Sequence, residues 1–208
     1  MAAIKYPQVS STDETEGIAE TSRLRGIRYN VHTALQDKPK EELQRIARKL
    51  ALPVQLMLLN LDGNMNIAMS IRTAAVMGCS DVWVVGQRRY DARPEVGSKN
   101  YIDVHKVRTI GDDPAKFFED IGVQPFLIEQ GGTPIEDMNF KRYFGKPVCF
   151  IVGSESHGIP PEFAEKMAKA PRLTISQYGL VRSFNVSMAS QTVLYEYFRQ
   201  WRQYRKEF

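Results

Sequence analysis

Three clusters of polar side chains could do chemistry, and one of them is Ser183, Asn185 and Ser187. They follow an apolar run at residues 172–175 and open a long helical pattern whose apolar side chains recur every three or four positions. Ser183 alone would suffice as a helix cap. Ligands of open α/β sheets bind beside helix N-termini, at the carboxyl ends of strands. Three polar residues at this place therefore favour a binding site over a cap alone.

A second cluster is Asn66 and Arg72, on the opening turns of a helix predicted over residues 66–77. Asn66 can cap this helix, and Gly78 suits its C-terminal end. Arg72 lies among apolar and small residues, where a guanidinium needs a partner or a route to water. It could reach the surface along its own aliphatic stem, or hold a phosphate over a cleft with its fork of donors. The sequence is compatible with both.

The remaining cluster is the loop Gly153 to Gly158, G-S-E-S-H-G, which follows an apolar strand pattern. A Walker A loop needs Lys and then Ser or Thr after its second glycine, where this chain has Ile159 and Pro160. A dinucleotide fingerprint needs Gly at position 155, which here is Glu155. Because a carboxylate repels a phosphate, the loop suits a ligand that is neutral or positively charged near the turn.

Strands and helices alternate along the chain. Apolar runs predict strands at residues 54–59, 81–86, 104–110, 124–130, 146–153 and 172–175. Periodic patterns predict helices at residues 41–50, 66–77, 114–122, 161–168 and from 186 onward. This alternation predicts an α/β fold with a mainly parallel sheet flanked by helices.

Two finer expectations concern helix ends and faces. Asp37 is the expected cap of the first helix, with Pro39 in its first turn. Ile121 is expected to face inward together with Phe117 and Phe118. By domain, residues 1–50 are predicted to form an N-terminal flexible arm and helical extension, and residues 51–208 one domain with a C-terminal helix.

The composition is that of an ordinary globular protein, with 208 residues, 43% hydrophobic residues and a net charge of +4. No apolar run approaches the roughly 20 residues of a membrane helix, and the N-terminus lacks the apolar core of a signal peptide. Cys79 and Cys149 are expected to be buried free thiols in a reducing compartment. The three histidines are scattered, so no metal site is expected. We therefore expect a cytoplasmic protein without membrane or metal partners.

Basic side chains gather in three places and are candidates for contact with an RNA backbone. These are Arg23 and Arg25, Arg88 and Arg89, and the tail residues Arg199, Arg202 and Arg205. Each group could instead be an ordinary solvated surface, and the tail arginines also suit the C-terminal end of a helix dipole.

In this order, the clusters resemble the motifs of the SpoU (TrmH-like) family of RNA ribose 2′-O-methyltransferases, a branch of the SPOUT superfamily. The resemblance covers roughly residues 54–197 and rests on matches to three motifs: Asn66 and Arg72; Gly153, Glu155 and Gly158; and Ser183 to Ala189. Two departures are Ala68, where the family often has Gly, and Phe184, where Leu is usual.

The resemblance implies a SPOUT fold with a deep trefoil knot in the C-terminal third, a homodimer with active sites near the subunit interface, and S-adenosylmethionine as cofactor. The catalytic residues that it implies are Arg72, Asn66, Glu155, Ser183 and Asn185, with Arg72 either helping to deprotonate the ribose 2′-hydroxyl or only positioning it. The cofactor residues that it implies are Glu129, Gln130, Gly131, Val152, Gly153, Glu155, Gly158, Ile175, Gly179, Leu180, Ser183, Phe184 and Asn185.

The resemblance implies RNA as the partner, and tRNA methylated at a D-loop guanosine is the favoured substrate by analogy with compact family members. Ribosomal RNA is the alternative substrate. A non-catalytic RNA-binding protein on the same scaffold is a second alternative, which the presence of all the motif residues disfavours. A nicotinamide-dependent oxidoreductase is a third, which the missing dinucleotide fingerprint disfavours.

Overall fold

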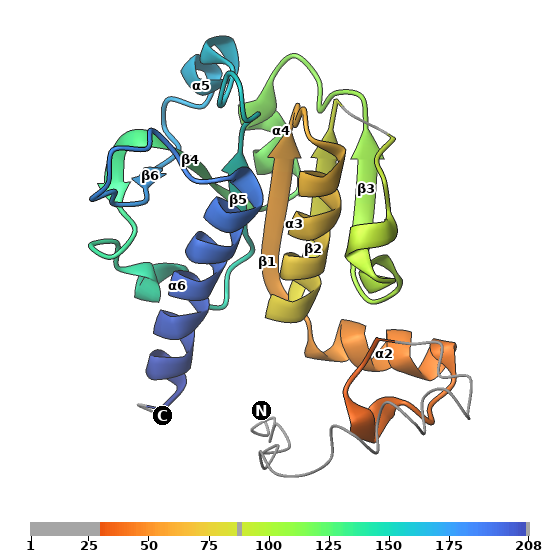
Figure 1. Cartoon of the computed structure of the whole chain (residues 1–208). Helices are drawn as coiled ribbons and strands as arrows, with labels where there is room; N and C mark the ends of the chain where they lie inside the picture. Colours follow the sequence, from red (N-terminus) through yellow and green to blue (C-terminus); the bar gives the residue numbers. More distant parts are fainter. Residues whose placement is uncertain (1–29, 87–88, 207–208) are drawn as a thin grey trace. The chain divides into compact units, whose positions relative to one another are not determined.

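The computed structural model describes residues 30–86 and 89–206, and the chain divides into two compact units, Met1–Asp37 and Lys38–Phe208. In the first unit, the described residues include a short 3-10 helix, η1 (Thr33–Leu35). The second unit contains the sheet and the helices that cover it (Figure 1). The division into an arm with a helical extension (residues 1–50) and one domain with a C-terminal helix (residues 51–208) stays a prediction.

One sheet of six strands organises the second unit, in the order β3-β2-β1-β5-β4-β6. Every strand pairs in parallel with its neighbours. The predicted α/β fold with a mainly parallel sheet is therefore confirmed. The strands are β1 (Leu52–Leu59), β2 (Cys79–Val85), β3 (Asp103–Val107), β4 (Gln124–Pro134), β5 (Val148–Val152) and β6 (Arg172–Thr174).

The strand order reverses between β1 and β5, because the chain first builds outward from β1 to β3 and later returns to place β5 on the other side of β1. In open parallel sheets, ligands bind at the carboxyl ends of the strands beside such a point. The loops after Leu59 and Val152 are therefore the places to look for a site.

Helices cover both faces of this sheet. The α-helices are α2 (Lys40–Leu50), α3 (Asn64–Met77), α4 (Pro114–Asp120), α5 (Pro161–Lys166) and α6 (Val186–Lys206), and the 3-10 helices are η2 (Arg93–Glu95), η3 (Ser98–Asn100) and η4 (Phe140–Tyr143). Helix α3 ends at Gly78, which has a φ of 79°. Its backbone N–H donates to the carbonyl oxygens of Ala74 and Ala75 in the last turn. Glycine adopts this left-handed conformation without steric cost, so the predicted helix end is confirmed.

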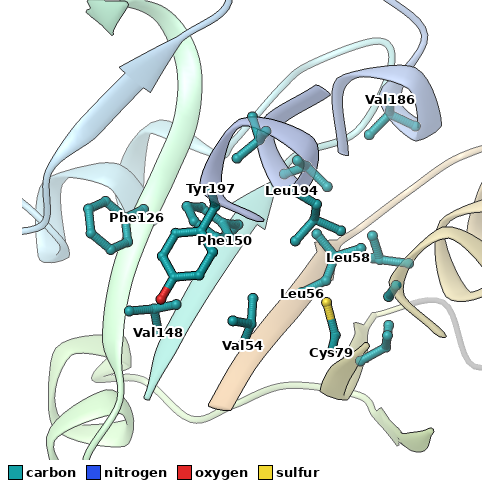
Figure 2. Packing of buried hydrophobic residues seen from close by; sticks show 14 of the residues in the cluster. Val54, Leu56, Leu58, Cys79, Phe126, Val148, Phe150, Val186, Leu194 and Tyr197 are labelled. Atoms are coloured by element: carbon teal, nitrogen blue, oxygen red, sulfur yellow. The ribbon is translucent and has the colours of Figure 1, made fainter. Parts of the chain in front are cut away.

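Two apolar cores lie on opposite faces of the sheet. On one face, α3 and α6 pack over the inward side chains of the central strands, where Tyr197 and Leu194 of α6 meet Phe126, Val148 and Phe150 (Figure 2). On the other face, α4 and α5 cover a second core that includes Met57, Phe118, Cys149, Ile151 and Met167. All five residues of β5 are buried, as expected for the central strand of a parallel sheet.

The structure corrects three predicted helix caps. Pro39 is the N-cap of α2, so Asp37 does not cap it. Gly63 is the N-cap of α3, which places Asn66 inside the first turn with its side chain directed elsewhere. Asn185, and not Ser183, caps α6, since its Oδ1 accepts the backbone N–H of Ser187 at 2.9 Å. Composition pointed to cap-forming residue types but did not fix which one occupies the cap position.

The structure also corrects the prediction that Ile121 faces inward with Phe117 and Phe118. Phe118 is buried, but Ile121 lies just past the end of the helix and is 38% exposed. The helix is shorter than predicted because its last turn closes at Asp120, so the periodic pattern no longer places Ile121 against the sheet.

Strand β4 is longer than predicted and is interrupted where it pairs with β6. Both Ile128 and Thr133 pair with Leu173, so the segment from Glu129 to Gly132 is looped out of the ladder. Gly132 lies against the β6 backbone, and a Cβ there would come within 2.6 Å of the Arg172 carbonyl group. This loop projects beside the carboxyl end of β5 because β4 and β5 are paired up to Ile128 and Val152.

No helix in the described ranges, 30–86 and 89–206, is long and apolar enough to cross a membrane.

Candidate active site

A pocket of about 570 Å³ opens at the carboxyl ends of β4, β5 and β6 and at the start of α6. Ten of the predicted site residues line it: Glu129, Gln130, Val152, Gly153, Glu155, Gly158, Ile175, Ser183, Phe184 and Asn185. Three segments far apart in the sequence therefore meet around one cavity, at the sheet edge where a parallel sheet binds ligands.

Glu155 is the centre of a hydrogen-bond network beside this pocket. Its Oε1 accepts the side-chain Nδ2–H of Asn66 at 2.5 Å, and its Oε2 accepts the backbone N–H of Asp62 at 3.0 Å. A carboxylate that accepts two such bonds is held in one orientation. The loop after β5 is thereby fixed to the loop after β1 and to the first turn of α3.

Asn185 continues the network to the third motif. Its Nδ2 donates to Asn66 Oδ1 at 3.1 Å, and its Oδ1 accepts both the N–H and the hydroxyl of Ser187, at 2.9 and 2.6 Å. Asn66 is therefore the bridge between Glu155 and Asn185. The structure brings these three predicted catalytic residues together in one continuous chain of hydrogen bonds.

The turn that carries Glu155 is closed by its backbone. The N–H and C=O groups of Ser154 and Gly158 form two mutual hydrogen bonds, at 3.0 and 2.8 Å. A Cβ on Gly153 would come within 2.0 Å of the Gly158 carbonyl carbon, so only glycine fits there. Gly63 has a similar role, since a Cβ there would come within 2.9 Å of Glu155 Oε1.

Sequence analysis missed a second set of polar residues at the same turn. The Ser156 hydroxyl donates to Asp62 Oδ2, and the same oxygen lies 2.6 Å from His157 Nδ1. The His157 N–H donates to Ser154 Oγ at 3.1 Å. Ser156 and His157 line the pocket. A signal was present in the sequence, because both residues lie inside the Gly153–Gly158 loop, but the motif fixes only its glycines and its glutamate.

Two predicted catalytic residues, Asn66 and Arg72, do not line the pocket; Asn66 is joined to it by hydrogen bonds, and the more distant one is Arg72. It lies on α3, it is exposed, and no hydrogen bond or ion pair joins it to any other described residue. This exposed position is compatible with both interpretations of Arg72, a side chain that reaches the surface and one that holds a phosphate, so its catalytic role stays a prediction. An unpaired guanidinium at the surface is also available to an anionic ligand.

The remaining predicted cofactor residues, Gly131, Gly179 and Leu180, do not line the pocket. Gly131 is part of the segment looped out of β4. Gly179 and Leu180 belong to an exposed stretch before α6 in which Leu180 is fully solvent-accessible. Their assignment as cofactor residues stays a prediction.

Two side chains fix the rim of the pocket on the β4 side. Gln130 donates from Nε2 to the Arg182 carbonyl at 2.7 Å, which joins the looped-out segment to the stretch before α6. Glu129 forms an ion pair with Arg172 at 2.7 Å across the β4–β6 ladder. Arg182 also lines the pocket, so the cavity carries charges of both signs.

The predicted RNA-binding arginines differ in whether another side chain already pairs with their charge. Arg199 forms a two-pronged ion pair with Glu196 and bonds Gln203, and the pKa of Glu196 is lowered by these Arg199 hydrogen bonds. Arg202 and Arg205 are exposed, and so is Arg89. Arg23, Arg25 and Arg88 lie outside the described residues.

A second cavity, of about 890 Å³, opens at the amino ends of β4 and β5, between α4 and α5. It is larger than the first, and none of the motif residues lines it. Among the described residues, no group of three or more His, Cys, Asp or Glu side chains could hold a metal ion.

Comparison with known proteins gives a family match over residues 53–195, to the SpoU rRNA Methylase family. The chain is 32% identical over 139 residues to the tRNA (guanosine(18)-2′-O)-methyltransferase of Escherichia coli K12, which covers 65% of this chain and 58% of that enzyme. It is 28% identical over 207 residues to the 23S rRNA (guanosine-2′-O-)-methyltransferase RlmB of Acinetobacter baylyi, covering 93% and 78%. The chain therefore spans less than two thirds of the Escherichia coli relative.

Among solved structures, an AdoMet-bound rRNA methyltransferase from Sinorhizobium meliloti superposes with a TM-score of 0.60 and 25% identity, covering 74% of this chain and 59% of that one. The shared fold includes the parallel sheet whose loops build the pocket. The family match spans the strands and loops that carry Asn66, Glu155 and Asn185. The chain belongs to the SpoU rRNA Methylase family.

Proposed function

We propose that this protein transfers a methyl group from S-adenosylmethionine to a ribose 2′-hydroxyl of RNA, and that the RNA is a tRNA methylated at a D-loop guanosine. The observation that carries the proposal is the hydrogen-bond chain through Glu155, Asn66 and Asn185. It joins the three motifs of an RNA methyltransferase family beside one pocket.

The chemistry of the pocket suits the proposed cofactor. Glu155 places a carboxylate at the turn, which disfavours a phosphate and favours a ligand with positive charge. Backbone groups of the Gly153–Gly158 turn and side chains such as Gln130 and Ser183 supply polar contacts for a nucleoside and an amino-acid group. Bound there, S-adenosylmethionine supplies a methyl group on a positively charged sulfur that becomes a neutral thioether after transfer.

Arg72 would act on the RNA. Because its guanidinium is exposed and has no partner among the described residues, it is free to take a phosphate next to the target ribose. That contact would position the 2′-hydroxyl and stabilise the negative charge that develops on its oxygen. Asn66, six residues earlier on the same helix, would hold the helix to Glu155 and so set the place of Arg72.

A homodimer is the proposed assembly. Helices α3 and α6 pack against each other and leave large apolar side chains exposed, namely Met65, Val76, Met188 and Tyr195. Where such side chains gather into one patch, they mark a surface for contact with another protein. Burying them against a second copy would place Arg72, on the same α3, near the interface. Light scattering during size-exclusion chromatography should give twice the chain mass, whereas a monomer at micromolar concentration would contradict this assembly.

The substrate is proposed from the similarity to the Escherichia coli tRNA enzyme, and the similarity to the Acinetobacter baylyi rRNA enzyme supports the alternative. Exposed Arg202 and Arg205 at the end of α6 would contact the RNA backbone. Arg199 contributes less to RNA binding in this proposal, because Glu196 already neutralises it.

The test is methyl transfer from labelled S-adenosylmethionine to unmodified tRNA and, separately, to rRNA. Arg72→Ala should lower transfer by at least about 100-fold while leaving cofactor affinity unchanged, because Arg72 lies outside the pocket. Arg45→Ala is the matched control, since Arg45 is exposed on α2, which precedes the amino end of β1.

Label in tRNA at one alkali-resistant linkage would support the proposal and identify the nucleotide. Label only in rRNA would keep the chemistry and replace the substrate. Cofactor binding without transfer to either RNA, or no cofactor binding at all, would contradict the proposal and favour a non-catalytic RNA-binding protein.

A further inference from the structure

The proposed function assigns no role to the polar side chains of Asp62, Ser156 and His157. It lies beside the Glu155 network, because the Asp62 N–H bonds Glu155 while the Asp62 side chain accepts the Ser156 hydroxyl. Ser156 in turn lies 2.6 Å from His157 Nδ1. The Asp62 carboxylate therefore contacts the Ser156 hydroxyl, which in turn contacts the His157 imidazole. This imidazole lines the pocket.

The direction of these hydrogen bonds fixes the tautomer of His157. A serine hydroxyl has one proton to donate, and a carboxylate can only accept. The Ser156 proton is therefore used on Asp62, so the contact with His157 needs a proton on Nδ1, donated to Ser156 Oγ. A neutral imidazole protonated on Nδ1 carries its lone pair on Nε2.

The free nitrogen is available to a ligand. His157 is exposed and lines the pocket, and no hydrogen bond joins its Nε2 to any residue in the described part of the chain. The backbone of His157 is held as well, since its N–H donates to Ser154 Oγ. The backbone of this residue and the Nδ1 side of its ring are thus both held, while Nε2 has no partner among the described residues.

We propose that His157 Nε2 accepts the proton that the ribose 2′-hydroxyl loses during methyl transfer. This role rests on the proposed function. The 2′-oxygen forms a bond to the methyl carbon, the carbon–sulfur bond breaks with its electron pair remaining on sulfur, and the 2′-proton passes to Nε2. The resulting imidazolium keeps its Nδ1–H on Ser156, and the Asp62 carboxylate stabilises its charge.

Other groups near the pocket are less suited to take this proton. The Arg72 guanidinium is a very weak base, since arginine stays protonated up to a pH of about 12. Both Glu155 oxygens already accept hydrogen bonds, and Glu129 is paired with Arg172. An imidazole is the side chain that ordinarily changes charge between about pH 5 and 8, where a general base is most effective.

Charged groups lie near His157 on several neighbouring segments. Asp62 lies behind Ser156, and Glu155 is two residues earlier in the same turn. Arg182 lies on another segment of the same pocket, and Glu129 is paired with Arg172. The pH dependence of the reaction is therefore assigned to His157 only by comparison with a variant at that position.

The first experiment is single-turnover methyl transfer between pH 5.5 and 8.5 with His157→Gln. Glutamine keeps a polar group of similar length but cannot accept a proton in this range. We expect a rate about 10²–10⁴-fold lower, a cofactor dissociation constant within about twofold of the wild type, and loss of the fall in rate toward acid pH. His105→Gln is the matched control, because His105 is a half-buried histidine on β3 that does not line the pocket.

The second experiment does not depend on RNA. Nitrogen NMR of the imidazoles in the cofactor-free wild type should show His157 protonated on Nδ1 at pH 8, and Ser156→Ala should remove this preference. Ser156→Ala should also lower the transfer rate, by less than His157→Gln does.

The outcomes separate this inference from the proposed function. A wild type that methylates RNA while His157→Gln matches His105→Gln in rate and pH profile would refute only the role of His157. A loss of cofactor affinity equal to the loss of rate would make His157 a cofactor ligand, and a proton on Nε2 in the wild type would also refute the base. A wild type that methylates no RNA would remove both proposals.

Discussion

The two halves of the sheet are built in different ways. The strand order reverses between β1 and β5. On one side of this point, β1, β2 and β3 follow in chain order, and β2 and β3 pair without a break. The one irregularity of β1 and β2 lies between Leu52 and Gln55, at the end away from the site. On the other side, β4 loops out four residues opposite β6, and a tight glycine turn follows β5.

The difference shows where the ligand chemistry is concentrated. The irregular half (β4, β5, β6 and the loops after them) supplies every residue that lines the pocket except Val186 and Ala189 of α6. The regular half (β1, β2, β3, α3 and the loops between them) contributes Asn66 and Asp62, which do not line the pocket and reach it through hydrogen bonds to Glu155, Ser156 and Asn185. Departures from the regular ladder free backbone and side chains for a ligand, while the regular half holds them in place.

Gly153→Ala should have the largest effect of any change proposed here. Its Cβ would overlap backbone atoms of Gly158 and Ile159, which no side-chain rotation can relieve. We expect a loss of about 3 kcal/mol or more in the free energy of unfolding, together with loss of cofactor binding. Urea titration and calorimetric binding measure both. Gly179→Ala is the control for stability alone, because nothing lies within 4 Å of a Cβ there; an equal free energy of unfolding for the two variants would contradict the tight turn.

Ile71→Ala tests the regular half alone. Ile71 is fully buried on α3, so its truncation should lower the free energy of unfolding by about 2–5 kcal/mol. Because the side chain does not line the pocket, the cofactor dissociation constant of the folded protein should stay within about twofold of the wild type. A variant of near-normal stability with weakened cofactor binding would reverse the roles assigned to the two halves.

Glu155→Gln tests the connection between the halves. An amide has one acceptor oxygen, so the N–H of Asp62 and the Nδ2–H of Asn66 can no longer both be accepted. We expect a loss of about 1.5–3 kcal/mol in methyl-transfer efficiency, roughly 10–150-fold, with little change in stability. Glu136→Gln is the control, since Glu136 is another hydrogen-bonded carboxylate, which accepts the Ser176 hydroxyl, but it lies outside the pocket lining.

The two cysteines should show the smallest effect, because one lies in each half and both are buried. Burial raises the pKa of the Cys79 thiol on β2 and of the Cys149 thiol on β5, so little thiolate is present at pH 8. Neither should react with a thiol reagent until the protein unfolds, and both should then be labelled at the same rate. Earlier labelling of Cys149 by mass spectrometry would show that the irregular half opens by itself.

Local features of the chain were predictable from its sequence. The apolar runs that became β5 and β1, and the glycine that ends α3 at Gly78, each depend on near neighbours in the sequence. The SPOUT fold with its C-terminal knot came from the motif resemblance, and family membership supports it, whereas periodicity alone indicated only an α/β sheet. The motifs placed Gly153, Glu155 and Asn185 at the pocket, and the resemblance added further lining residues such as Glu129 and Gln130.

The contacts that make the site were not predictable. Asn66 meets Glu155 across 89 positions of sequence, and Asn185 meets Asn66 across 119. Nothing in a local pattern assigns Asn66 to a distant carboxylate when its own helix offers a cap position. The same holds for Ser156 and His157, whose relation to Asp62 depends on how β1 and β5 are placed side by side.

The position of β5 beside β1 has a consequence for synthesis on the ribosome. β1 is complete at Leu59, but the strand that covers its second edge begins only at Val148. At about 5–20 residues per second, the nascent chain carries an uncovered apolar strand edge for several seconds. Such an edge pairs readily with other chains. The yield of soluble protein should therefore depend on translation speed and on chaperones that shield β1 until β5 emerges.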